Sequence, residues 1–179
     1  MLDESLRKEV AELSAKLMAL TAQTAPKSKG EDDVEIVVVT GEGKERIAEK
    51  MIEMADEREK NFIRDGESVK KADAIILIGA FGERTLGLNC GACGFESCRD
   101  LRNAGRKKGR DFVGPNCAYK LIDLGIAIGS ATKLSAIIGA DTRVMYRIGT
   151  AAKKLGIAKS DVVMGIPIAV TSKNPFFDR

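Results

Sequence analysis

The four cysteines of this chain are its most informative residues, because three of them lie within nine positions of one another. The stretch from Cys90 through Cys93 to Cys98 reads CGACGFESC, and Cys117 follows after a further 18 residues. Three thiols interleaved with glycines can wrap a compact iron–sulfur cluster and turn backbone N–H groups towards its sulfurs. The Gly-Pro-Asn turn directly before Cys117 would bring it back as the fourth ligand. The spacing therefore predicts a cluster bound by all four cysteines.

The spacing favours a four-iron (4Fe-4S) over a two-iron cluster, although spacing alone does not decide the number of irons. Structural zinc bound by four cysteines is the alternative, but such sites more often use two separated cysteine pairs. In that case the chain would be a non-enzymatic binding or assembly module. Disulfides are not expected, because the chain shows no signal-peptide pattern and the cytoplasm keeps thiols reduced.

The chain contains no histidine. This removes the commonest general base, the Ser-His-Asp and Cys-His nucleophile arrangements and every mixed Cys/His zinc site. The protein would instead supply burial, hydrogen bonds and positive charge around a cofactor that carries the electron chemistry. We therefore expect an electron-transfer or redox protein, and whether it is an enzyme, such as a flavin-dependent oxidoreductase, stays open.

The elements that position the cysteines alternate between strands and helices, which predicts an α/β fold, with α+β as an option. The 179 residues and 44% hydrophobic content suit a single domain over residues 1–179. The glycine-rich, basic segment 86–117 would be inserted into it, with its order depending on metal. Buried strands are predicted at 34–40, 74–79 and 161–170, and helices at about 3–22, 43–59, 96–106, 117–138 and 142–155.

The first predicted helix has a stripe of large apolar side chains at spacings of four and three, namely Leu6, Val10, Leu13, Leu17 and Leu20. Such a stripe usually packs on its own domain. Its heptad spacing would also suit pairing with the same helix of a second copy, in a homodimer.

Beyond the spacing, CGACGFESC with its Gly-Pro-Asn-Cys return resembles the small four-iron domains of electron-transfer subunits and corrinoid iron–sulfur proteins. Together with TAPKSKG, FIRDG, DLGIAIGSA and the terminal KNPFFDR, it resembles the DUF2148 family of uncharacterised ferredoxin-domain proteins over nearly the whole chain. That family is similar in outline to the nitroreductase-like flavoproteins. The resemblance implies a nitroreductase-like sheet with flanking helices and a homodimer, and it leaves open a bound flavin.

Nitroreductase-like proteins hold the flavin phosphate with basic and hydroxyl side chains from an early loop and with a late basic residue. The resemblance implies that Lys27, Ser28 and Lys29, together with Lys173 and Arg179, would bind FMN or another flavin. Lysines stand where that fold tends to use arginines, so they would meet a phosphate as point charges without bidentate geometry. The alternative is that these are ordinary solvated lysines.

A basic run follows Cys98, comprising Arg99, Arg102, Arg106, Lys107, Lys108 and Arg110. These cations would raise the potential of an anionic cluster or dock an acidic protein electron carrier, and a solvated helix face is an equal alternative. The run lacks aromatic residues for base stacking, and the net charge is only +3, so no nucleic acid partner is predicted. The longest apolar run is interrupted by Asp123, so we expect no membrane partner and a cytoplasmic location.

Overall fold

The computed structural model describes residues 2–177. The α-helices are α1 (Glu4–Thr24), α2 (Gly41–Glu53), α3 (Asn61–Lys70), α4 (Cys98–Asn103), α5 (Ala118–Ile138) and α6 (Tyr146–Lys154). Two short 3₁₀ turns, η1 (Ser28–Gly30) and η2 (Met54–Glu57), accompany them. The strands are β1 (Val34–Thr40), β2 (Ala74–Ala80), β3 (Lys107–Lys108), β4 (Val113–Gly114), β5 (Asp141–Thr142) and β6 (Val162–Ala169).

Four strands form the central sheet in the order β1-β2-β6-β5, and every neighbouring pair is antiparallel. Strand β2 is buried along its whole length between β1 and β6. In this register Ile76 faces Val38 on one side and Ile166 on the other. The apolar runs of β2 and β6 therefore fill the middle of the molecule. Strand β1, predicted to be buried, lies instead at the edge of the sheet, and only its Val39 is buried.

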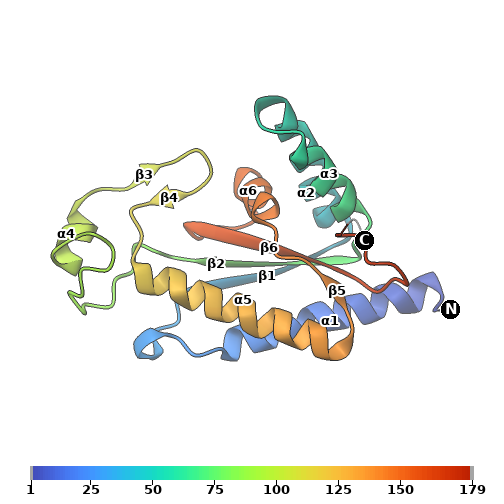
Figure 1. Cartoon of the computed structure of the whole chain (residues 1–179), viewed down its shortest axis with the longest axis horizontal. Helices are drawn as coiled ribbons and strands as arrows, with labels where there is room; N and C mark the ends of the chain where they lie inside the picture. Colours follow the sequence, from blue (N-terminus) through green and yellow to red (C-terminus); the bar gives the residue numbers. More distant parts are fainter. Residues whose placement is uncertain (1, 178–179) are drawn as a thin grey trace.

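Helices cover both faces of the sheet, so the molecule has three layers (Figure 1). Helices α1 and α5 lie side by side on one face, where Ala15, Leu124 and Ile76 belong to the same apolar cluster. Helices α2, α3 and α6 cover the other face around Phe62 and Ile148. The predicted mixture of helices and strands is confirmed, and the antiparallel pairing makes the fold α+β.

The strand predictions agree with the structure to within a residue or two, and five predicted helices are present with shifted ends. The helix predicted to run to residue 59 ends earlier, and a separate helix, α3, follows it. The short strands β3, β4 and β5 were not predicted. Two-residue strands have no periodicity from which a sequence could reveal them.

The expectation that the leucine stripe of α1 packs on its own domain is wrong. Leu13 and Leu20 are 54% and 57% exposed, whereas Ala11, Ala15 and Ala22 are fully buried. Small side chains let the helix lie close to the sheet and to α5, so the alanine face turns inwards. The larger leucines remain at the surface, which leaves an apolar face without cover in the single chain.

Among the helices of residues 2–177, α5 is long and apolar enough to cross a membrane by length and composition. That is weak evidence, since core helices of globular proteins pass the same test. Helix α5 lies against the sheet, and its Lys120 and Asp123 are buried with partners inside the protein. The cytoplasmic location remains a prediction.

Helix α6 crosses β6 so closely that one helix position has no room for a side chain. A Cβ at Gly149 would lie 1.9 Å from the carbonyl oxygen of Val163. We expect Gly149→Ala to lower the free energy of unfolding by about 1–3 kcal/mol or more, because backbone must move. Urea denaturation measures the change.

The matched control is Gly125→Ala, in the exposed face of α5, where an added Cβ meets nothing within 4 Å. This substitution is expected to be neutral or to stabilise by about 0.5–1 kcal/mol, the usual gain of alanine over glycine in a helix. Equal effects of the two substitutions would contradict the close helix–strand packing.

Candidate iron–sulfur centre

The cysteine segment leaves the sheet after β2, passes through α4 and the β3–β4 hairpin, and returns at the start of α5 (Figure 1). All four cysteines are free thiols. Cys90 is exposed and Cys93 half-buried in the loop, whereas Cys98 opens α4 and Cys117 precedes α5, both buried. The predicted segment 86–117 thus supplies two accessible and two buried thiols at one end of the sheet.

The thiol of Cys98 sits among backbone N–H groups. The N–H of Asn89 donates to its Sγ at 3.4 Å, and the Asn89 Oδ1 accepts from the Cys98 N–H at 2.9 Å. The Asn89 N–H is the largest cause of a lowered pKa for Cys98; the N–H groups of Gly87 and Leu88 and the hydroxyl of Thr85 add to it, while burial opposes it. Donors that favour the thiolate are what a metal-bound cysteine sulfur requires.

Left-handed backbone conformations make this arrangement possible. Gly87, Gly91 and Gly94 have φ of 70°, 72° and 84°, and Asn89 has φ of 49°. Glycine adopts this region without strain and asparagine tolerates it better than most residues. Sequence reasoning missed Asn89, although an asparagine directly before a cysteine in a glycine-rich loop is a recognisable signal for such a turn.

The return to Cys117 is fixed by close contact with the opposite side of the segment. The N–H of Cys117 donates to the carbonyl of Gly82 at 2.7 Å. Asn116 fills the space beside Gly82, where a Cβ would lie 2.2 Å from the Asn116 Oδ1, and its amide donates to the Val113 carbonyl. Residues 114–116 therefore link β4 to α5 beside Gly82, and the predicted turn that brings Cys117 to a shared cluster stays a prediction.

The structure does not gather the four thiols into one coordination shell. Across residues 2–177, no group of three or more histidine, cysteine, aspartate or glutamate side chains is placed to hold a metal ion. Thiols on one segment and N–H donors around Cys98 nevertheless fit the chemistry of an iron–sulfur site. Ligation by Cys90, Cys93, Cys98 and Cys117 stays a prediction.

The residues implied for flavin binding lie in two places. Lys27, Ser28 and Lys29 come together at the η1 turn beyond the end of α1. Lys173 lines a hollow beside the first turn of α1 with Glu4 and other residues. Since a 21-residue helix spans roughly 30 Å, Lys173 is remote from the turn within one chain. Arg179 lies outside the described residues, and the flavin site remains a prediction.

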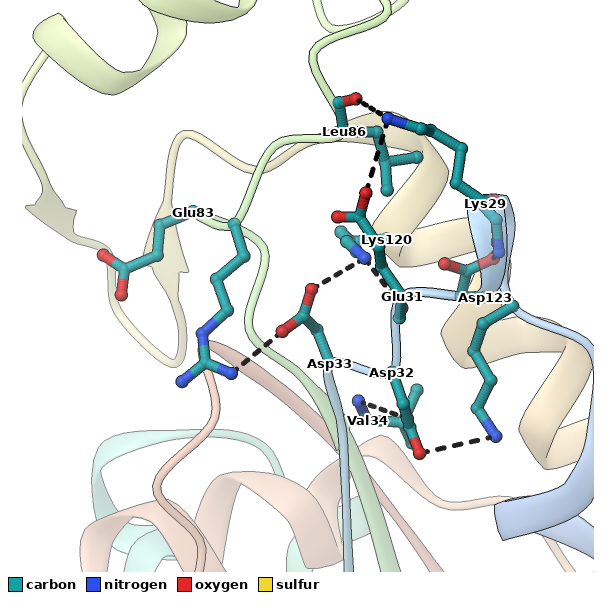
Figure 2. A network of polar contacts seen from close by, with 12 residues as sticks. Lys29, Glu31, Asp32, Asp33, Val34, Glu83, Leu86, Lys120 and Asp123 are labelled. Atoms are coloured by element: carbon teal, nitrogen blue, oxygen red, sulfur yellow. Dashed lines mark hydrogen bonds and ion pairs between the residues drawn. The ribbon is translucent and has the colours of Figure 1, made fainter.

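A buried polar network joins the turn, the sheet and α5 (Figure 2). The ammonium group of Lys120, only 1% exposed, lies 2.7 Å from the Asp33 carboxylate and donates to the carbonyl of Glu31. Arg84 reaches the other oxygen of Asp33 at 2.8 Å. Sequence reasoning missed Lys120; a lysine within an apolar helix is a signal of a buried charge that needs a partner.

Comparison of this chain with known proteins shows its family. The chain belongs to the family described as "Uncharacterized protein containing a ferredoxin domain (DUF2148)", which matches residues 113–179. An uncharacterized protein of Archaeoglobus fulgidus is 59% identical over 177 residues, covering 99% of this chain and 96% of the relative.

Solved structures show the same fold at low identity. The FMN-dependent nitroreductase NfnB from Mycobacterium smegmatis, in complex with NADPH, is 13% identical with a TM-score of 0.57, over 90% of this chain and 78% of that one. A nitroreductase family protein from Clostridium novyi NT is 16% identical with a TM-score of 0.52, over 95% and 76%. The predicted nitroreductase-like fold is confirmed.

The buried network generates a prediction about stability. Lys120→Met leaves part of the Asp33 charge uncompensated, so we expect the free energy of unfolding at neutral pH to fall by about 3–5 kcal/mol. Lys8→Met, which breaks the exposed pair with Glu4, is the control and should cost less than about 1 kcal/mol. Similar losses in the two variants, by urea denaturation, would contradict the role of Lys120.

Lys120→Met should also change how the free energy of unfolding falls at acid pH. Burial raises the pKa of Asp33, but hydrogen bonds from Arg84 and Lys120 outweigh it and hold the pKa below its usual value. The stability that Asp33 contributes is therefore complete above about pH 4, the unfolded value, and is lost as pH falls through the lower folded pKa. In Lys120→Met this acid-dependent loss should be smaller.

Proposed function

We propose that this chain is an iron–sulfur redox protein, in which Cys90, Cys93, Cys98 and Cys117 hold a four-iron cluster. The observation that carries the proposal is the Cys98 sulfur, buried and faced by the Asn89 N–H inside a cysteine-rich loop. The family description, which names a ferredoxin domain, supports it. A bound cluster would supply one-electron chemistry, taking an electron from a reduced carrier and releasing it to an acceptor.

The residues of the chain would tune that chemistry rather than take part in bond making. Asn89 and Gly87 provide backbone N–H groups next to the Cys98 sulfur, which would stabilise the reduced, more negative state. Leu86 and Leu101 are buried within the segment and would limit access of water. Exposed Cys90 leaves one side of the site open to solvent and to a partner.

The first test is anaerobic purification with iron, sulfide and zinc analysis on one sample. We expect visible absorption with about four irons and four sulfides per chain, as for a four-iron cluster. Cys98→Ser should lose most of the iron, because a buried ligand is removed. Ala92→Ser, an exposed change between the ligands in the same loop, is the control and should keep it.

A colourless protein with one zinc would overturn the redox proposal. It would favour the alternative, a non-enzymatic binding or assembly module that uses a structural Cys₄ zinc site. The favoured reading rests on the cysteine spacing, since three crowded cysteines and one remote are less typical of zinc than of clusters.

An acidic protein carrier is the proposed electron partner. Lys107 and Lys108 are exposed in β3, and Arg99 is exposed on α4. Reversing Lys107 and Lys108 to glutamate should slow reduction by an acidic ferredoxin about tenfold at low salt, with a smaller effect at high salt, because the attraction is electrostatic. Stopped-flow absorption measures the rate.

The double change Lys71→Glu and Lys154→Glu, at two exposed lysines outside the cysteine segment, is the control that matches this charge reversal. Equal slowing by both variants would show that net charge alone matters. No slowing by the reversal of Lys107 and Lys108 would remove β3 from the docking surface.

We propose that the chain pairs with a second copy through the face formed by α1 and α5. The two helices lie side by side, and both carry exposed apolar side chains, among them Leu13, Leu20, Ile122 and Ile137. A self-complementary helical face is a common basis of two-fold dimers. The homodimer implied by the family resemblance agrees with this surface.

Light scattering after gel filtration tests the pairing. The wild-type chain should elute as a dimer, and the double change Leu13→Glu and Leu20→Glu should convert it to monomers, because charges would be buried in the interface. Ile63→Glu on α3, also exposed but on the other face of the sheet, is the control and should stay dimeric. A monomeric wild-type chain would contradict the proposal.

A further inference from the structure

Ser28 is the centre of the turn implied for flavin-phosphate binding, and both of its donors are already used. Its backbone N–H donates to the Oδ1 of Asp123 at 2.9 Å, and its hydroxyl donates to the same atom at 2.7 Å. Asp123 is 2% exposed, so this carboxylate is fixed inside the protein. These are the donors that a phosphate oxygen would need.

The two flanking lysines are also engaged. The ammonium group of Lys27 donates to the carbonyl oxygens of Ala22 and Gln23 at the end of α1 and lies 3.9 Å from Asp32. The ammonium group of Lys29 donates to the carbonyl of Leu86 at 3.0 Å and pairs with Glu31 at 3.4 Å (Figure 2). Neither lysine is directed at an open anion site.

The remaining oxygen of Asp123 also disfavours a phosphate at this turn. Its Oδ2 is buried and finds no hydrogen-bond partner in residues 2–177. An unpaired carboxylate oxygen calls for a donor, whereas a phosphate brings further acceptors and negative charge. A phosphate at this turn would face a buried carboxylate at short range, and like charges there repel.

We infer that Asp123 occupies the position of the phosphate, so that the turn Lys27–Lys29 is closed to phosphorylated flavins. The turn instead braces the cysteine segment at two places, through Asp123 in the helix that follows Cys117 and through Leu86, which precedes the loop around Cys98. This inference concerns the flavin alone and does not depend on whether the cysteines bind a cluster.

Flavin titration of the full chain tests the inference, with fluorescence quenching as the readout. FMN and riboflavin are compared because they differ only in the phosphate. In the wild-type chain the two dissociation constants should agree within about threefold, or neither flavin should bind. In Asp123→Ala, which frees the donors of Ser28 and removes the charge, FMN should bind at least tenfold more tightly than in the wild type, with riboflavin unchanged.

A variant that keeps the shape guards against misfolding. Asp123→Asn still accepts from Ser28 through its Oδ1 but carries no charge, and if Asp123→Ala does not fold by circular dichroism, Asp123→Asn should still improve FMN binding at least threefold. Wild-type binding of FMN at least tenfold tighter than riboflavin, abolished in Ser28→Ala, would overturn the inference. So would the absence of any gain in a folded Asp123 variant.

The result of the flavin titration can be distinguished from the result of the cluster experiment. Iron and sulfide content is measured on the same samples before flavin is added. A chain without a cluster that shows the predicted flavin behaviour supports the closed turn and overturns only the proposed function. A chain that holds a cluster and binds FMN through Ser28 supports the proposed function and overturns the closed turn.

Discussion

The buried charges of α5 govern how the rest of the molecule is assembled. Lys120 and Asp123 enter an apolar interior, where each must find a partner or cost several kcal/mol. Their partners are Asp33 at the start of the sheet and Ser28 in the turn after α1, which belong to different layers. Because α5 begins directly after Cys117, the same contacts hold one end of the cysteine segment against the sheet.

This connection gives the redox proposal its structural basis. One end of the segment leaves β2, the most buried strand, and the other enters α5, which the polar network holds in place. Between these anchors the loop around Cys98 adopts left-handed turns that direct N–H groups at its sulfur. The fold is shared with nitroreductases, but the chemistry would come from a segment that is anchored to the fold rather than from the fold itself.

The sequence predicted the structure correctly where a single physical effect decides the outcome. The β-branched run at 34–40 forms a strand with the predicted bounds, because β-branched side chains pack well on a pleated sheet. Asp123, which interrupts the longest apolar run, is buried and has Ser28 as its partner. The α1 leucines were predicted to face the core because the prediction weighed hydrophobicity alone. Alanines allow closer packing against the sheet and α5, so they take the inner face. Helix α3 was missed because Gly66 and few apolar residues weaken its pattern.

The cysteine segment reaches the hydrophobic interior only through the half-buried Phe112, which bears on how the protein matures. Within the described chain, neither of the two apolar core clusters takes a buried residue from 86–117. The core can therefore form without the segment, and we expect the newly made chain to fold before any iron arrives. Cluster delivery would then begin at exposed Cys90 and finish at buried Cys98 and Cys117, so biogenesis would proceed from the surface inwards.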